Sequence, residues 1–187
     1  MLKKILIQVI HRCSPIKSRY LYEKKYFEKH EGSRVNWIDT IRFYYRWKKY
    51  KTSKPMDISA PWITFKAYDY IKRFIHSDMK VFEWGIGGST LFFIDHGLRI
   101  ISVEHDQMWI KTVNDRISSF PHSNNFRIEF VGKDPEGSMR HDRCLSFSRD
   151  YFGISFCNYV SHIENYNVFF NIIFIDGRAR SDCLKIS

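Results

Sequence analysis

Apolar residues follow two kinds of spacing over residues 58–187, and the two kinds alternate along the chain. Short runs rich in β-branched and aromatic residues are typical of strands, whereas apolar positions that recur every three or four residues are typical of helices. The expected strands cover residues 79–84, 99–105, 126–132 and 168–176. The expected helices cover residues 61–75, 89–97 and 107–120, and a further one begins near Ala179. This alternation predicts an α/β fold with a parallel sheet.

Residues at the ends of these segments agree with the assignment. Pro61 stands at the expected first turn of one helix, and Gly97 is placed to stop the next one. Asp106 is suited to cap the third helix, which Pro121 would end. The run over 168–176 is apolar almost throughout, which is typical of a strand buried on both faces.

Residues 1–57 have a different character. Apolar residues at helical spacing over 2–10 predict a short amphipathic helix, which either lies on a membrane surface or packs against its own domain or a second copy of the chain. Residues 20–51 interleave basic and aromatic side chains, as proteins that bind single-stranded nucleic acid often do. Helical spacing from Trp37 to Lys48 favours a helix with a core-facing stripe instead. Residues 51–57 are expected to form a linker.

The positive charge lies almost entirely in this first part. Residues 1–54 hold 15 Lys and Arg against 4 Asp and Glu, a net charge of +11, whereas residues 55–187 hold 15 against 16. Such a basic segment either meets nucleic acid, anionic lipid or an acidic partner, or forms a solvated surface. We therefore expect two parts: a basic, aromatic-rich helical extension over 1–57 and an α/β domain over 58–187.

The loop after the first strand, in FEWGIGGSTLFF, carries the most specific chemistry. Gly85, Gly87 and Gly88 allow a sharp turn and a close approach of a ligand to the backbone, or form a turn that binds nothing. A dinucleotide site would need a third glycine where Thr90 stands, and the acid Glu83 would repel a diphosphate. The pattern instead favours a ligand that carries a positive charge.

Four segments in order resemble the class I S-adenosylmethionine-dependent methyltransferases, and among them a poorly characterised bacterial subgroup. FEWGIGGST is similar to their first motif, and ISVEHD is similar to their second-strand motif, with Glu104 standing 21 residues after Glu83. PWITFKAYDYI upstream and IIFIDGRARSDC downstream also resemble the subgroup. The resemblance covers about residues 58–187 and implies a Rossmann-like parallel sheet that binds S-adenosylmethionine.

The resemblance implies roles for individual residues. Glu83 would favour the cationic part of the cofactor, directly or through water, and Glu104 would accept hydrogen bonds from the ribose hydroxyls; the alternative is that both are surface carboxylates. His105 would flank the adenine or be a satisfied polar neighbour, and Asp134 is the nearest candidate for an acid close to the adenine. The expected cofactor-binding residues are Glu83, Gly85, Gly87, Gly88, Ser89, Thr90, Glu104 and His105.

The methyl acceptor is expected at the end of the fourth strand. Asp176 would act as a general base for a hydroxyl or orient the acceptor, and Arg178 and Arg180 would bind a carboxylate or phosphate on it. The alternative is that Asp176 caps the next helix and that both arginines are solvated. No D/N-P-P-Y/F motif follows this strand, which argues against methylation of nucleic-acid bases. O-methylation of a small molecule or, from the resemblance, of a glycan is the first hypothesis.

The sheet of the resembled family has seven strands, whereas this chain reaches Ser187 soon after the fourth. We therefore expect an incomplete sheet of about four strands, either C-terminally truncated or completed by a partner or a homo-oligomer. The second hypothesis is a non-catalytic, truncated pseudoenzyme that binds the cofactor and docks through its basic N-terminal segment.

Cysteine spacing and hydropathy add little specific chemistry. The cysteines are Cys13, Cys144, Cys157 and Cys183. They form no C-x-x-C pair, so no metal site is expected, and their scatter suits reduced thiols in the cytoplasm. No apolar run approaches the ~20 residues that span a bilayer, so membrane contact would be peripheral, through the first helix.

Overall fold

The computed structural model describes Leu21 and residues 37–118, 120, 124–136 and 143–187. The chain divides between Lys54 and Pro55 into two units, and each is described by itself. The amphipathic helix expected over 2–10 lies outside the described residues.

The described part of the first unit is dominated by helix α3 (Trp37–Tyr50), which confirms the helix expected there. Thr40 is its buried residue, whereas Tyr45 is 57% and Trp47 43% exposed. Two basic residues, Lys48 and Lys49, lie in its last turn, where they complement the negative end of the helix dipole.

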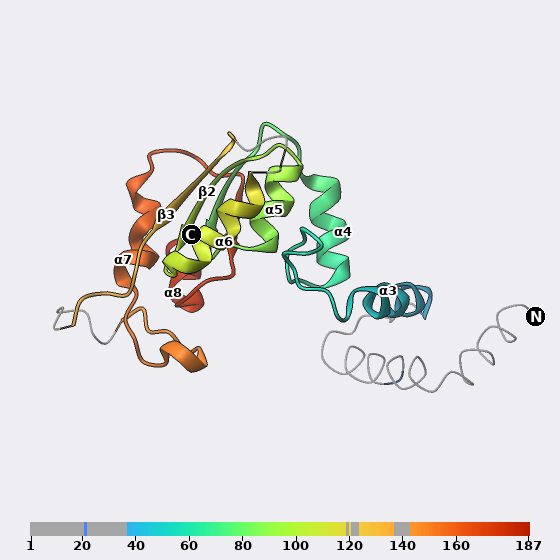
Figure 1. Ribbon diagram of the computed structural model, residues 1–187, viewed down its shortest axis with the longest axis horizontal. Coiled ribbons are helices and arrows are strands. Elements are labelled where there is room, and N and C mark those ends of the chain that lie inside the picture. Colours follow the sequence, from blue (N-terminus) through green and yellow to red (C-terminus); the bar gives the residue numbers. More distant parts are fainter. Residues whose placement is uncertain (1–20, 22–36, 119, 121–123, 137–142) are drawn as a thin grey trace, which may run out of the picture. The chain divides into compact units, whose positions relative to one another are not determined.

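The second unit is built on one parallel sheet. Its strands are β1 (Lys80–Trp84), β2 (Arg99–Glu104), β3 (Phe126–Phe130) and β4 (Ile172–Ile175), in the order β3-β2-β1-β4 (Figure 1). All three pairings are parallel, which confirms the α/β fold. The chain builds outward from β1 to β3 and then returns to the other side of β1, so the strand order switches direction between β1 and β4.

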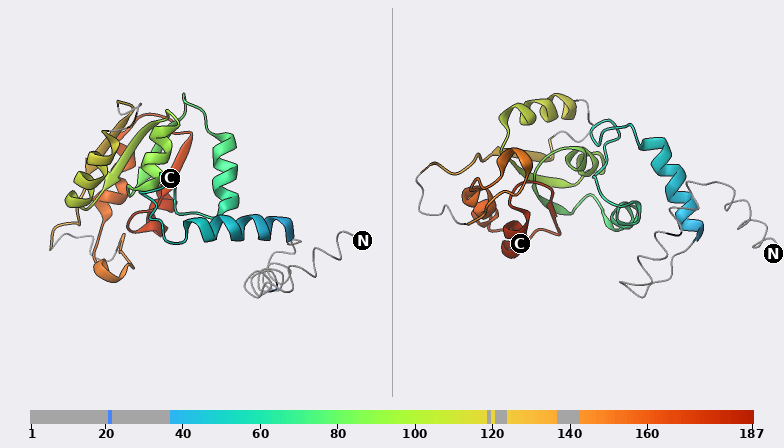
Figure 2. Two further views of the ribbon diagram at one scale, coloured as in Figure 1. Left: turned by 45° about the vertical axis from the view of Figure 1, so that its right-hand side comes forward. Right: turned by 90° about the horizontal axis from the view of Figure 1, so that it is seen from below.

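Helices cover both faces of the sheet (Figures 1 and 2). On one face lie α5 (Gly88–Asp95), α6 (Gln107–Ile117) and, packed against α5, α4 (Phe65–Phe74). On the other lie α7 (Cys157–Val160) and α8 (Arg180–Ile186). Two short 3-10 helices, η1 (Arg149–Tyr151) and η2 (Ser161–Asn165), flank α7.

The alternation of side chains along β1 divides the core into two clusters. Val81 packs in the cluster with α5 and α6, whereas Phe82 and Trp84 pack in the cluster with α7 and α8. All three are completely buried, as expected of a central strand with helices on both faces. Trp84 also satisfies its Nε1–H by donating to the carbonyl of Tyr159 (2.9 Å).

The largest differences between the predicted and observed element boundaries are in α4, α6 and β4. Helix α4 begins at Phe65, because Thr64 is its N-cap and accepts from the N–H of Ala67 (3.3 Å). Helix α6 ends at Ile117, within the segment predicted to be helical up to residue 120. Strand β4 covers only Ile172–Ile175, although the N–H of Asn171, just before it, also donates to the Lys80 carbonyl of β1 (2.9 Å).

The prediction that the fourth strand is buried on both faces is wrong. Phe169 is 81% and Ile173 37% exposed. Among the described strands, β4 pairs with β1 alone and therefore forms an edge of the sheet. Apolar residues on an edge strand keep one side open to solvent.

Residues 55–57 belong to the α/β unit and not to a linker, contrary to the prediction. A Cβ on Gly88 would lie 2.5 Å from the carbonyl oxygen of Pro55 and 2.4 Å from that of Ala60. The N–H of Ala60 donates to the Pro55 carbonyl (3.2 Å), and Met56 packs against the core cluster that contains α5. Residues 55–60 therefore cover the start of α5 and exclude any side chain at position 88.

Within the part of the chain that the structure describes, no helix combines the length and the apolar character needed to span a membrane.

Candidate functional site

A cavity of about 290 Å³ opens where β1, β2 and β4 end. Open α/β sheets bind ligands at this edge, where the strand order reverses. The cavity is lined by Gly85, Ile86, Glu104, His105, Asp106, Trp109, Asp176, Gly177, Arg178 and Arg180. Six of the predicted site residues are thus brought together: Gly85, Glu104, His105, Asp176, Arg178 and Arg180. The other five, Glu83, Gly87, Gly88, Ser89 and Thr90, do not line it.

Glu83 is completely buried under the glycine loop. Its carboxylate accepts hydrogen bonds from Ser89 Oγ (2.5 Å), Thr90 Oγ1 (2.7 Å) and Ser102 Oγ (2.8 Å). Burial raises the pKa of Glu83 to about 7, although the three hydroxyls favour the charged form. The alternative that Glu83 is a surface carboxylate is therefore wrong. Glu83 ties β1 to β2 and to the first turn of α5.

The three loop glycines differ in their surroundings, and two of them exclude a side chain. Gly85 has a φ of +85°, and a Cβ there would lie 2.7 Å from Gly177 Cα, so it allows a close approach of the loops after β1 and β4. Gly88 is covered by the backbone of residues 55–60. Of these three glycines, Gly87 is the one at which a Cβ would meet no described atom within 4 Å. Space for a ligand against the loop backbone therefore lies at Gly87.

Glu104 ends β2 and turns its carboxylate back toward the loop. Oε1 accepts from the N–H groups of His105 (2.7 Å) and Asp106 (3.0 Å), and Oε2 accepts from the N–H of Ile86 (3.1 Å). Burial alone would raise the pKa of Glu104, but contacts with His105 and with these backbone donors outweigh it and hold that pKa below its usual value. Glu104 is therefore a buried, ionised group in the cavity wall and not a surface carboxylate.

His105, Arg178 and Tyr151 form one contact group at the cavity. The Nδ1 of His105 lies against Glu104 Oε1, and its Nε2 accepts from Arg178 Nε (3.0 Å). The guanidinium carbon of Arg178 stands 4.4 Å from the centroid of the Tyr151 ring, and the His105 ring meets Tyr151 edge-on at 4.8 Å. His105 thus has a polar neighbour at each ring nitrogen, and its role beside an adenine stays a prediction.

Asp176 and Arg180 form a local ion pair after β4. Arg180 Nη2 lies 2.8 Å from Asp176 Oδ1 and donates to the Asp176 carbonyl (3.1 Å), while its Nε donates to the Gly177 carbonyl (3.2 Å). Partial burial raises the pKa of Asp176, and Arg180 opposes the rise. Because Ala179 is the N-cap of α8, the alternative that Asp176 caps this helix is wrong.

Two further acids serve as helix caps. Asp106 is the N-cap of α6 and accepts from the N–H groups of Met108 (2.9 Å) and Trp109 (3.1 Å), as predicted. Asp134, the candidate for an acid near the adenine, lies outside the cavity lining. Its carboxylate accepts from the N–H of Cys157 (2.6 Å) and of Asn158 (3.0 Å) at the start of α7.

Sequence reasoning missed Ile86, Trp109, Gly177 and Tyr151. Trp109 stands in the first turn of α6, and its Nε1–H donates to the carbonyl of Ile86 (2.8 Å), which fixes the ring beside the loop. A residue in the first turn after a strand of the site is a signal that would have found it. Tyr151 lies in the segment 133–168, where the sequence shows no clear pattern, and no signal pointed to it.

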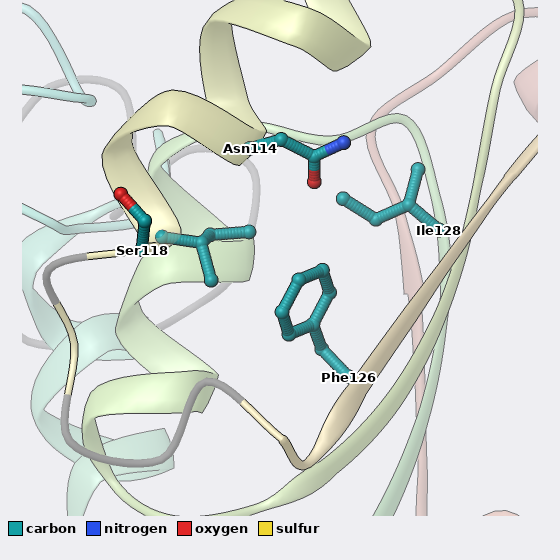
Figure 3. A pocket seen from close by; sticks show the side chains of 5 residues that line it. Asn114, Ser118, Phe126 and Ile128 are labelled. Carbon is teal, nitrogen blue, oxygen red and sulfur yellow. The ribbon is translucent and has the colours of Figure 1, made fainter.

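A larger hollow of about 400 Å³ lies away from these residues, between α6 and β3 (Figure 3). Asn114 and Ser118 face it from the helix, and Phe126 and Ile128 face it from the strand. Ile117 completes the lining. No ionisable side chain lines this hollow, so it offers no acid–base chemistry, and the smaller cavity is the better candidate.

Comparison of the chain with models of protein families, with curated proteins and with solved structures found no match. Among the described residues, no group of three or more His, Cys, Asp or Glu side chains is placed to hold a metal ion. The described cysteines, Cys144, Cys157 and Cys183, form no disulfide with one another. Function must therefore be inferred from the cavity itself.

Proposed function

We propose that this chain has a Rossmann-like fold and binds S-adenosylmethionine in the cavity at the ends of β1, β2 and β4. We further propose that it transfers a methyl group to an oxygen of a small molecule or glycan. One observation carries the proposal. Three motifs that resemble the class I methyltransferases, far apart in the sequence, supply Gly85, Glu104 and Asp176 to one cavity at the switch in strand order.

The residues of the cavity fit this cofactor. A carboxylate oxygen has two lone pairs, so Glu104 Oε2, which accepts one hydrogen bond from Ile86, keeps one position for a ribose hydroxyl. Gly87 does not line the cavity but follows Ile86, which does, and the space beside Gly87 would admit a ligand against the loop backbone. Trp109, fixed by its hydrogen bond to Ile86, offers an aromatic face to the cavity. A volume of about 290 Å³ is at the lower end of the range for small-molecule sites.

The cofactor, when bound, supplies a methyl group on a positively charged sulfur. The protein's own residues bind and orient, and positioning accounts for most of the catalysis in an in-line displacement. Asp176 is the one cavity carboxylate whose pKa is raised, by burial, which suits it to accept a proton from an acceptor hydroxyl. Glu83 contributes by holding the loop, since its three hydroxyl partners come from β2 and α5.

Calorimetric titration of the purified chain with S-adenosylmethionine tests the binding. We expect saturable binding that Glu104→Gln weakens by at least tenfold, because the variant removes the charge beside the ribose position. Glu164→Gln, on the exposed surface of η2, is the matched control and should bind like the wild type. No binding at millimolar cofactor, or equal binding by the wild type and Glu104→Gln, would overturn the proposal.

The ion pair between Asp176 and Arg180 favours a second function, cofactor binding without turnover. A base held by a guanidinium 2.8 Å away is a weaker proton acceptor than a free one. In this case the basic N-terminal segment would dock on a partner, and α3 would be part of the docking surface. A screen of hydroxyl acceptors with radiolabelled cofactor separates the two functions: binding without methyl transfer supports the second. The cytoplasmic localisation stays a prediction.

A further inference from the structure

The charged groups of the cavity differ in their partners, and Arg178 has neither a carboxylate nor a backbone partner for its guanidinium among the described residues. Glu104 accepts from three backbone N–H groups, Asp106 caps α6, and Asp176 is paired with Arg180. Among the described residues, no carboxylate lies within ion-pair distance of Arg178. A partly buried cation in a cavity without a counter-charge favours an anionic ligand.

The guanidinium of Arg178 is also held in place on two sides. Its Nε donates to His105 Nε2 (3.0 Å), and one face rests on the Tyr151 ring at 4.4 Å, a favourable cation–π contact. Its two terminal nitrogens make no hydrogen bond to any described residue. These are the atoms that form the paired, parallel hydrogen bonds by which arginine binds carboxylate or phosphate.

His105 is oriented for this purpose by its own neighbours. Its Nε2 accepts from Arg178, and its Nδ1 lies against Glu104 Oε1, so both ring nitrogens have a neighbour that fixes the orientation of the ring. His105 is nearly buried, with 8% of its side chain exposed, and its ring packs edge-on against Tyr151 and Phe156. His105 and Tyr151 are therefore positioning residues that act through Arg178.

We propose that Arg178 is the anion-recognition residue of this cavity and binds a carboxylate or phosphate group of the ligand. The inference rests on the proposed function for the identity of that ligand. The anion is either the carboxylate of the cofactor or an acidic group of the methyl acceptor. Arg180 does not share this role, since its guanidinium is bonded to Asp176 and to the backbone of residues 176 and 177.

Two adenosyl compounds and one simple anion distinguish the sources. S-Adenosylhomocysteine carries the carboxylate, methylthioadenosine lacks it, and both are titrated by calorimetry into the wild type, Arg178→Met and Arg180→Met. Inorganic phosphate is titrated into the same proteins and followed by NMR. Loss of charge-assisted hydrogen bonds should weaken binding of the matching anion about 10- to 100-fold in Arg178→Met, while Arg180→Met stays within about threefold.

Each outcome of these titrations either supports or overturns anion recognition by Arg178. If Arg178→Met weakens S-adenosylhomocysteine but not methylthioadenosine, the anion is the cofactor carboxylate. If both adenosyl compounds bind normally and phosphate binding is lost, the anion belongs to the acceptor. If Arg178→Met changes none of the three, or Arg180→Met changes them equally, the proposal is overturned. If neither adenosyl compound binds the wild type, the proposed function fails, and the phosphate titration still decides the role of Arg178.

The positioning role of Tyr151 has its own test. Tyr151→Phe keeps the aromatic face and should retain wild-type anion affinity, whereas Tyr151→Leu should lose about 3- to 10-fold. Equal anion affinities of the Phe and Leu variants would remove Tyr151 from the site. Circular dichroism checks that each variant folds. Should Arg178→Met not fold, Arg178→Lys replaces it, because lysine keeps the charge but loses the planar fork.

Discussion

Gly85 and Gly177 face each other where β1 and β4 end, so closely that a Cβ on Gly85 would lie 2.7 Å from Gly177 Cα and 2.7 Å from its backbone nitrogen. A Cβ on Gly177 would in turn lie 1.9 Å from the hydroxyl of Tyr159. The two loops that form the floor of the cavity thus touch through backbone alone. The distance between the loop after β1 and the loop after β4 is set by this contact.

Gly177→Ala should lower the free energy of unfolding by about 1–3 kcal/mol, the usual range for overpacking a core. The added methyl group must displace Tyr159, which is completely buried. Tyr159→Phe removes the atom that the methyl group meets, so the double variant should recover part of the loss. Urea denaturation of the four proteins measures this coupling. If the losses of stability in Gly177→Ala and Tyr159→Phe simply added in the double variant, the predicted coupling would be wrong.

Gly88→Ala should destabilise the protein to a similar degree, for a different reason. Its Cβ would meet the carbonyl oxygens of Pro55 and Ala60 at 2.5 and 2.4 Å, and backbone yields less easily than a side chain. We expect faster proteolytic cleavage over residues 55–60. Gly87→Ala is the matched control, since its φ of 164° is extended and nothing stands within 4 Å. Cleavage at equal rates in both variants would show that residues 55–60 do not pack on α5.

Glu83 should make stability fall as the pH rises toward neutrality. Its pKa is about 7 in the folded protein, against 4.5 for a solvent-exposed glutamate as in the unfolded chain, so the unfolded state loses this proton at a lower pH. Between these values the folded state binds more protons, and the free energy of unfolding decreases with pH. The difference between the two pKa values corresponds to roughly 3 kcal/mol of stability. This stability is lost as the pH rises from about 4.5 to 7, and the contribution of Glu83 does not change further above that.

Glu83→Gln isolates this contribution. The amide cannot ionise, so the stability of the variant lacks this pH dependence. The free energy of unfolding of the wild type minus that of Glu83→Gln should therefore fall by roughly 3 kcal/mol across this window. Thermal unfolding at a series of pH values measures the difference, which cancels the titration of other groups. A difference that is independent of pH from 4 to 8 would mean that Glu83 is not buried as described.

Asp106→Ala should cost about 1 kcal/mol of stability through loss of the N-cap of α6. The side chain accepts from two backbone N–H groups of the first turn, which would be left without this partner. Asp106→Asn keeps the acceptor oxygen and should remain within about 0.5 kcal/mol of the wild type. Chemical denaturation compares the three. If Asp106→Asn lost as much stability as Asp106→Ala, the contribution of Asp106 would come from its charge and not from capping.

Much of the α/β unit could be predicted from the sequence because its signals are local. β1 and β2 are apolar runs, Gly97 stops α5 with a φ of +76°, and Asp106 caps α6. Parallel strands place their carboxyl ends on one edge, and for this reason Glu104 and Asp176 were expected at one site and do line one cavity.

The parts that could not be predicted depend on contacts between distant segments. The hydroxyl partners of Glu83 come from β2 and α5, and nothing in the local pattern shows that its carboxylate points inward. The apolar run over 168–176 does not reveal that β4 lies at an edge, since that follows from strand order. Tyr151 contacts Arg178 from a segment that is held by an isolated bridge between Leu145 and Ser155. The spacing of apolar residues in this segment does not predict that bridge.

The position of β4 has a kinetic consequence. The N–H of Lys80 donates to the side chain of Asn171, which lies 91 residues later in the sequence. Strand β4 must therefore pair with β1 across that separation. Contacts of such sequence separation carry a high loop-closure entropy and form late. Asp176, Gly177 and Arg178 follow β4 and reach the cavity only when it docks. During refolding, ligand affinity should therefore develop after secondary structure, which makes binding a measure of completed folding.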